Sequence, residues 1–181
     1  MIIVLDPGHG GHDPGAVGPT GLREADVVLD VARRARLLFD AGGHDCRLTR
    51  DADAYVTLET RADFANRLGA DLFVSIHCNA AESRDAHGTE TWYYEGSDVG
   101  EQIATLTQSH LLQRCGRRDR GIKATRSFSV LRRTRMPAVL VELAFISNRG
   151  EEYRLRHEGF RSLAAVAVYD AVNEWAEVSA V

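Results

Sequence analysis

Residue types that bind metals and transfer protons occur at four separated places in the sequence. His9 lies in a glycine-rich turn after an apolar run, and His77 ends a second apolar run. Glu24 begins a segment of helical periodicity, and Glu142 interrupts the apolar run that follows Pro137. Two imidazoles and one carboxylate are a common ligand set for catalytic zinc, with a fourth position open to water. A further carboxylate beside such a site can act as a general base.

Other catalytic motifs fit the sequence less well. The turn at Gly8 and Gly10 has Asp13 where a dinucleotide-binding fingerprint requires its third glycine, and no phosphate-binding lysine follows. His157-Glu158 lacks the second histidine of the HExxH zinc motif, and the nucleophile elbow Gly-x-Ser-x-Gly of serine hydrolases does not occur. The four candidate residues are far apart in the chain, so the fold must bring them together.

Short β-branched runs alternate with longer segments of helical periodicity. The predicted strands are residues 2–5, 45–49, 72–77, 89–94, 128–131 and 139–141. The predicted helices are residues 24–41, 58–68, a segment from 98 toward 115, a segment that begins at 148, and 163–175. This alternation predicts an α/β fold, with a twisted, mostly parallel six-stranded sheet flanked by helices on both faces. In such sheets the ligand site lies beyond the carboxyl ends of the strands, where both His9 and His77 are placed.

Length and composition favour one soluble globular domain over residues 1–181. Hydrophobic residues make up 44% and charged residues 27% of the 181 residues, which excludes disordered and fibrous classes. The net charge of -4 gives no general attraction to nucleic acid or to an anionic membrane. No apolar stretch is long enough to span a bilayer, and residues 1–5 lack the basic region of a signal peptide. The three cysteines do not form a disulfide framework, so buried free thiols are expected.

One segment of the chain is strongly basic. Nine cationic residues lie between Arg114 and Arg135, against Asp119 as the single acid. The sequence favours a solvated helix end and loop here, while attraction to anionic wall polymers or to peptide carboxylates remains an alternative. The segment lacks the interleaved aromatic residues that are typical of single-stranded nucleic-acid binders.

Several separated motifs together resemble one enzyme family. They are residues 6–15 (DPGHGGHDPG), Glu24, residues 48–50 (LTR), Arg61 with residues 65–66 (AN), residues 74–80 (VSIHCNA) and residues 139–148 (VLVELAFISN). In this order they resemble the zinc-dependent N-acetylmuramoyl-L-alanine amidases of the Amidase_3 type, and the resemblance extends from Met1 to about Trp175.

The resemblance implies roles for the candidate residues. It implies one zinc ion (Zn2+) per chain, held by His9, Glu24 and His77, with Glu142 as the catalytic acid and base. It also implies hydrolysis of the amide that joins N-acetylmuramic acid to L-alanine in peptidoglycan. Asn79 beside the site is expected either to orient the substrate or to cap a turn.

The expected partner is peptidoglycan, with no nucleic acid and no membrane span, and the expected state is a monomer. The expected place of action is the cell wall; without a signal peptide, the chain would be released by cell lysis or derive from a longer protein. Because only a short connection separates Tyr94 from Asp98, no inhibitory helix is expected over the cleft. Arg50 and Arg61 are expected to tie loops to the sheet. Two alternatives stay open: a zinc peptidase or deacylase acting on another amide, and a non-catalytic wall-binding relative.

Overall fold

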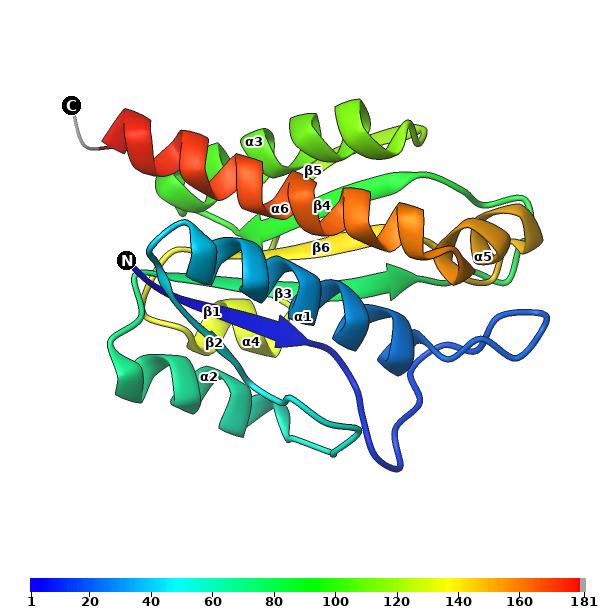
Figure 1. Ribbon diagram of the computed structural model, residues 1–181, viewed down its shortest axis with the longest axis horizontal. Coiled ribbons are helices and arrows are strands. Elements are labelled where there is room, and N and C mark those ends of the chain that lie inside the picture. The colour runs from blue at the N-terminus through cyan, green and yellow to red at the C-terminus, as the bar shows by residue number, and fades with distance from the viewer. Residues whose placement is uncertain (180–181) are drawn as a thin grey trace.

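Six strands form one sheet in the order β2-β1-β3-β6-β4-β5 in the computed structural model, which describes residues 1–179 (Figure 1). The strands are β1 (Ile2–Pro7), β2 (Asp45–Leu48), β3 (Leu72–Asn79), β4 (Thr89–Tyr94), β5 (Asp119–Thr125) and β6 (Ala138–Phe145). The helices are α1 (Glu24–Ala41), α2 (Leu58–Leu68), α3 (Asp98–Cys115), α4 (Ser129–Arg133), α5 (Arg149–Arg156) and α6 (Glu158–Ser179). The predicted α/β fold with a six-stranded sheet is confirmed.

The direction of the strands decides which residues meet at one edge of the sheet. Strands β2, β1, β3 and β6 are parallel, so their carboxyl ends lie at the same edge. Strand β4 pairs antiparallel with β6, and β5 is parallel to β4. The first residues of β4 and β5 therefore lie at the edge where β1, β3 and β6 end.

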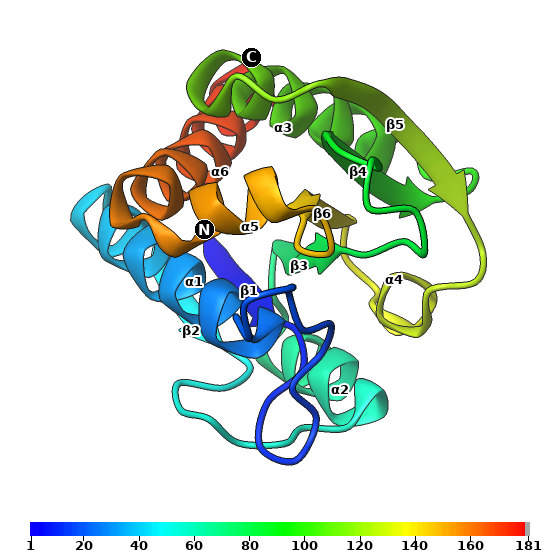
Figure 2. The ribbon, with the colours of Figure 1, turned by 90° about the vertical axis from the view of Figure 1, so that its right-hand side faces the viewer.

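Helices cover the two faces of the sheet unequally (Figure 2). The long helices α1, α3 and α6 pack over one face, where the larger apolar cluster includes Val28, Ile103 and Val168. The short helices α2 and α4 lie on the other face, over a smaller cluster that includes Val4 and Phe73. Residues of the second cluster alternate along β1, β3 and β6 with residues of the first, as expected for strands that are buried on both faces.

The helix boundaries agree with the capping signals in the sequence. Helix α1 ends before Gly42-Gly43, as predicted, and α2 begins after Thr57, whose side chain accepts a hydrogen bond from the amide of Thr60. Asn148 caps α5 by accepting from the amides of Gly150 and Glu151. Helix α6 begins at Glu158, five residues before its predicted start.

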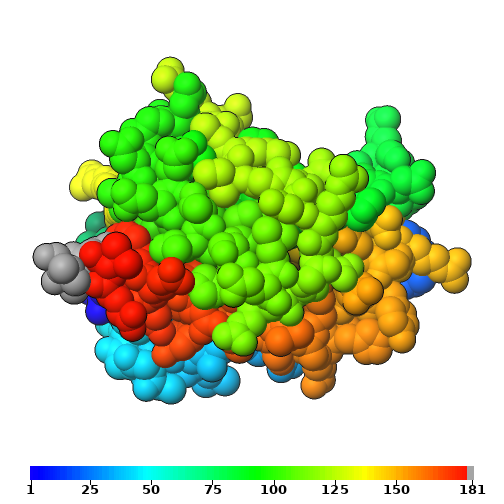
Figure 3. Space-filling view, turned by 90° about the horizontal axis from the view of Figure 1, so that it is seen from above, coloured from blue at the N-terminus to red at the C-terminus, as the bar shows by residue number. Residues whose placement is uncertain are grey.

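The predicted strand at residues 128–131 is wrong. Phe128 is the N-cap residue of α4, and the fifth strand is β5, within the basic segment that was interpreted as a helix end and loop. A short apolar run does not by itself distinguish a strand from a helical turn. Strand β5 lies at the edge of the sheet, and Figure 3 shows the yellow-green segment that contains it at the surface. Edge strands are rich in charged residues, which conceals their periodicity.

The three cysteines are free and buried, as predicted. None of the helices in residues 1–179 combines the length and the apolar character needed to cross a membrane.

Candidate metal centre

The turn after β1 holds His9 in an unusual conformation. His9 has a φ of 61°, in the left-handed region that residues other than glycine rarely adopt. Its Nδ1 atom lies 2.8 Å from Oδ2 of Asp13, which fixes the orientation of the imidazole ring. Such backbone strain is typical of functional sites. The turn thereby directs Nε2, the other ring nitrogen of His9, toward Glu24 at the start of α1.

Glu24 is buried in the first turn of α1, and backbone groups hold both of its carboxylate oxygens. Oε2 accepts a hydrogen bond of 2.9 Å from the amide of Ala16, and Oε1 accepts one of 2.9 Å from the amide of Cys78. The helix dipole also favours the ionised form of an acid at this position. Glu24 is thus a rigid, charged group beside the carboxyl end of β3.

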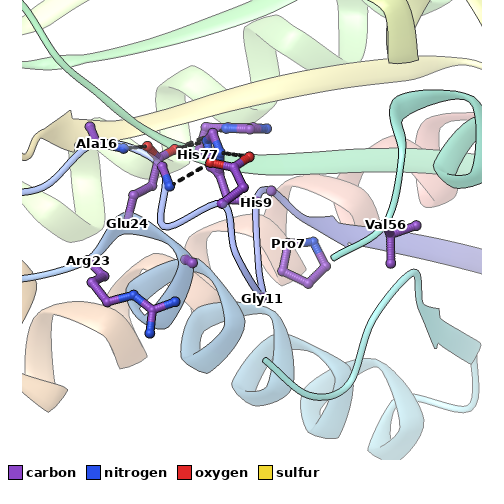
Figure 4. A network of polar contacts seen from close by, with 12 residues as sticks. Pro7, His9, Gly11, Ala16, Arg23, Glu24, Val56 and His77 are labelled. Carbon is purple, nitrogen blue, oxygen red and sulfur yellow. Dashed lines mark hydrogen bonds and ion pairs between the residues drawn. The ribbon is translucent and has the colours of Figure 1, made fainter. Parts of the chain in front are cut away.

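His9, Glu24 and His77 converge on one point (Figure 4). Oε1 of Glu24 lies 3.1 Å from Nε2 of His9 and 3.0 Å from Nδ1 of His77. Burial alone would raise the pKa of Glu24, but the hydrogen bonds and positive charges of His77 and His9 lower it well below its ordinary value. Burial likewise opposes protonation of His9, yet Glu24 and Asp13 raise the pKa of His9 above its ordinary value.

This donor set fits a divalent metal such as zinc. One potential ligand atom from each of the three side chains lies within 4.8 Å of the others. Two imidazoles and one carboxylate match the composition of catalytic zinc sites. A carboxylate such as Asp13 on the outer nitrogen of a histidine is the usual support of a metal ligand, because it fixes the ring and increases its basicity. A cation at this point would replace the protons that otherwise join the imidazoles to Glu24.

Glu142 lies next to His77 in the sheet. The two residues are paired across β3 and β6, so their side chains project from the same face. Glu142 is only partly exposed, and its Oε2 atom is shielded from solvent and has no hydrogen-bond partner within residues 1–179. Burial and the negative charges of Glu24 and Glu90 raise the pKa of Glu142 well above its ordinary value, although Lys123 opposes this rise. An unpaired carboxyl group therefore faces the cleft beside the three converging residues.

The cleft has a volume of about 450 Å³. His9, His77 and Glu142 line it together with Tyr55, Val56 and Leu58 from the segment that leads into α2, and with Phe128 and Val130 from the segment of α4. The short connection at residues 95–97 is the reason why the sequence predicts no inhibitory helix over the cleft. This connection lies at the opposite edge of the sheet from the cleft, because β4 runs antiparallel to β6. Residues 80–88 enter β4 at the edge of the site and contain no helix.

Buried arginines support the floor of the site, as the sequence predicts. Arg61 donates to Oδ1 of Asp6 at 2.8 Å and to the carbonyl oxygens of Pro7 and His9 at 2.7 Å. Arg50 donates to the carbonyl oxygens of Pro7 and Gly8. These contacts tie the His9 turn to the elements below it.

Asn79 does not line this cleft within the described part of the chain. Its Nδ2 atom donates a 3.0 Å hydrogen bond to Oε1 of Glu90 at the start of β4. Sequence reasoning missed Glu90 and the orienting role of Asp13. The role of Asp13 could have been predicted only from its position four residues after His9, within the motif at residues 6–15.

Comparisons with known proteins agree over nearly the whole chain. The Amidase_3 family, described as N-acetylmuramoyl-L-alanine amidase, matches residues 3–174. The chain is 40% identical over 171 residues to N-acetylmuramoyl-L-alanine amidase LytC of Bacillus subtilis, an alignment that covers 93% of this chain and 34% of LytC. It is 34% identical over 221 residues to N-acetylmuramoyl-L-alanine amidase AmiC of Neisseria meningitidis, covering 98% of this chain and 53% of AmiC. The chain thus spans about a third to a half of the length of these curated relatives.

Solved structures show the same architecture. The structure of N-acetylmuramoyl-L-alanine amidase AmiC2 of Nostoc punctiforme superposes with a TM-score of 0.93 at 36% identity, covering 98% of this chain and 97% of that chain. The family match over residues 3–174 covers residues of all six strands of the sheet and the cluster of His9, Glu24 and His77, so the fold, the site and the family assignment agree. The chain belongs to the Amidase_3 family of N-acetylmuramoyl-L-alanine amidases.

Proposed function

We propose that this chain hydrolyses the amide bond between N-acetylmuramic acid and L-alanine in peptidoglycan, using one zinc ion held by His9, Glu24 and His77. The observation that carries the proposal is the convergence of two imidazole nitrogens on Oε1 of Glu24, at 3.1 and 3.0 Å, beside the unpaired carboxyl group of Glu142. Its place of action is the cell wall, which is where a protein with this substrate must act.

The protein groups have distinct tasks in this reaction. When bound, zinc supplies a Lewis acid that activates water at neutral pH and stabilises negative charge on the scissile carbonyl oxygen. Asp13 and the backbone amides around Glu24 hold the ligand side chains in place. The ionised carboxylate of Glu142 accepts a proton from the attacking water and later donates it to the nitrogen of the departing L-alanine. A raised pKa suits a group that must hold this proton between the two steps.

Metal analysis together with product analysis tests the proposal. We expect about one zinc per chain, and we expect digested sacculi to release intact stem peptides with a free L-alanine amino group and uncut glycan. A chelator should stop the release, and added zinc should restore it. Cleavage at another amide would instead indicate a zinc peptidase or deacylase. Absence of cleavage by the zinc-loaded protein would indicate a non-catalytic wall-binding protein.

Replacing His77 with alanine is expected to remove the metal. The change deletes one of three ligand side chains, so zinc content after dialysis should fall to near zero, and peptide release should fall with it. The matched control is His157→Ala, because His157 is an exposed histidine at the end of α5. Full zinc retention by the His77→Ala protein would contradict the ligand assignment.

Gly8 provides an independent test through packing alone. A Cβ atom on Gly8 would lie 2.1 Å from Cε1 of His77, so the imidazole ring must move. We expect Gly8→Ala to weaken zinc binding by about tenfold or more while every ligand remains present. The control is Gly159→Ala in α6, where a Cβ would meet no atom within 4 Å. Competition with a fluorescent zinc chelator measures the affinity, and equal affinity in both variants would refute the expectation.

A further inference from the structure

Four donors surround the carboxylate of Glu90, which is buried at the start of β4. Oε1 accepts hydrogen bonds from Nδ2 of Asn79 at 3.0 Å and from Nε1 of Trp92 at 3.1 Å. Oε2 accepts from Nε of Arg120 and from Nζ of Lys123, both at 2.7 Å. Because the two cations bind the same oxygen, they lie side by side. The pKa of Glu90 would be raised by burial, but Lys123 and Arg120 lower it below its ordinary value.

Each of these cations is also seated on an aromatic ring. The guanidinium of Arg120 lies 4.7 Å from the ring centroid of Phe145, and the ammonium of Lys123 lies 4.9 Å from that of Trp92. A cation over an aromatic face is stabilised by the ring quadrupole and loses conformational freedom. Two charged side chains that are normally mobile are thereby held in fixed positions before any ligand arrives.

Both cations keep unused donors and access to solvent. The side chain of Arg120 is 30% exposed and that of Lys123 is 33% exposed, whereas Glu90 is 3% exposed. Within residues 1–179, Nη2 of Arg120 has no hydrogen-bond partner, and the single hydrogen bond of the Lys123 ammonium is the one to Glu90. Two positive charges share the single carboxylate of Glu90. An anionic group in front of Arg120 and Lys123 would meet N–H donors that are already held in position and have no other partner in the described part of the chain.

The pair lies beside the proposed catalytic group. Glu90 is the cross-strand partner of Glu142 in the antiparallel pairing of β4 with β6, and directly opposite residues have Cβ atoms about 4.5–5.5 Å apart on one face. His77 is the partner of Glu142 on the other side. His77, Glu142 and Glu90 therefore form one row across the sheet. The side chains of Arg120 and Lys123 reach Glu90 from β5, where Lys123 is the cross-strand partner of Trp92.

We propose that Arg120 and Lys123, anchored by Glu90, bind a carboxylate of the peptide that departs from the scissile amide. This inference rests on the proposed function, because it needs a peptide held next to Glu142. The departing stem peptide carries free carboxylates, which a guanidinium and an ammonium recognise through short, charge-assisted hydrogen bonds. The subsite orients the substrate, with the peptide over β4 and β5 and the glycan toward the wall formed by Tyr55 and Leu58.

Two forms of one substrate test the subsite. Soluble disaccharide-peptides are released from sacculi with a glycosidase, and half of the sample is treated with carbodiimide and ammonia to convert its carboxylates to carboxamides. The amide between N-acetylmuramic acid and L-alanine is unchanged by this treatment. For the zinc-loaded wild type, we expect kcat/KM to be about 10- to 100-fold higher on the carboxylate form, mainly through KM.

Variants assign this preference to the cations. In Arg120→Gln and Lys123→Met, the ratio of kcat/KM between the two substrates should fall several-fold toward one. In the triple variant Glu90→Gln, Arg120→Gln, Lys123→Met, the buried charge is removed together with both of its cations, so this variant, in which the ratio should also fall toward one, keeps the test valid if a single change unfolds the protein. The matched control is Arg126→Gln, because Arg126 belongs to the same basic segment but is 71% exposed and pairs with Glu95. This control should keep the ratio of the wild type.

The outcomes separate the two proposals. A wild type that cleaves both substrates equally, or variants that lose activity equally on both, would overturn the carboxylate subsite and leave the amidase function standing. A zinc-loaded wild type that cleaves neither substrate would overturn the proposed function and the subsite with it.

Discussion

Replacement of Glu142 by glutamine is expected to lower kcat by roughly 10³-fold while the fold and the metal content stay unchanged. Glutamine keeps the size of the side chain but cannot accept a proton from water and pass it to the leaving nitrogen. The uncharged amide also suits a position where Oε2 is shielded and unpaired, so the free energy of unfolding should not fall. Release of stem peptides with a free L-alanine amino group, measured per zinc-loaded chain, gives the rate.

A matched glutamate distinguishes this effect from a general loss of charge. Glu95 is 53% exposed and pairs with Arg126, so Glu95→Gln should retain the rate of the wild type. A Glu142→Gln protein that releases peptides at the wild-type rate would remove the acid and base role from Glu142. A Glu142→Gln protein that lacks zinc would show instead that this residue contributes to metal binding.

Replacement of Arg61 by methionine is expected to destabilise the protein by about 3–5 kcal/mol, because it leaves the buried carboxylate of Asp6 without its cation. The two side chains are 3% and 1% exposed, and Nη1 of Arg61 lies 2.8 Å from Oδ1 of Asp6. The change also removes the donors to the carbonyl oxygens of Pro7 and His9. The midpoint of urea denaturation, monitored by circular dichroism, should fall accordingly.

Helix α2 supplies the control for this experiment. Arg67 is exposed near the end of the same helix, so Arg67→Met should change the free energy of unfolding by no more than about 0.5 kcal/mol. Equal denaturation midpoints for Arg61→Met and the wild type would show that Asp6 is stabilised without Arg61, for example by Ser75 and Thr49, which also donate to it.

Much of this architecture could be predicted from local sequence patterns. Apolar runs followed by or ending in a histidine predicted β1 and β3, although each strand continues two residues beyond its predicted end, and the parallel arrangement then placed both histidines at one edge. Capping residues such as Thr57 and Asn148 predicted helix starts, because their side chains satisfy backbone amides within a few residues. Such signals are local, so one sequence is sufficient to read them.

The features that were missed depend on contacts between distant segments. Strand β5 carries charged residues and a glycine, and its strand conformation depends on pairing with β4. Glu90 lies next to Glu142 only because β4 reverses direction within the sheet, a choice that no residue of β4 signals. The bond between Asp13 and His9 requires the positive φ of His9, which is a property of the folded turn.

The alternation of β3 also controls the sulfur chemistry of this protein. Cys78 follows His77 directly, and a thiolate there would compete for any soft metal ion and react with oxidants. Strand geometry turns its side chain away from the cleft, into the apolar layer beneath α1 and α6. Burial raises the pKa of Cys78 well above its ordinary value, and it raises the pKa of Cys46 to about 12 and that of Cys115 to about 11. Burial therefore disfavours the thiolate form of all three cysteines, which is the form that binds metals and reacts with oxidants.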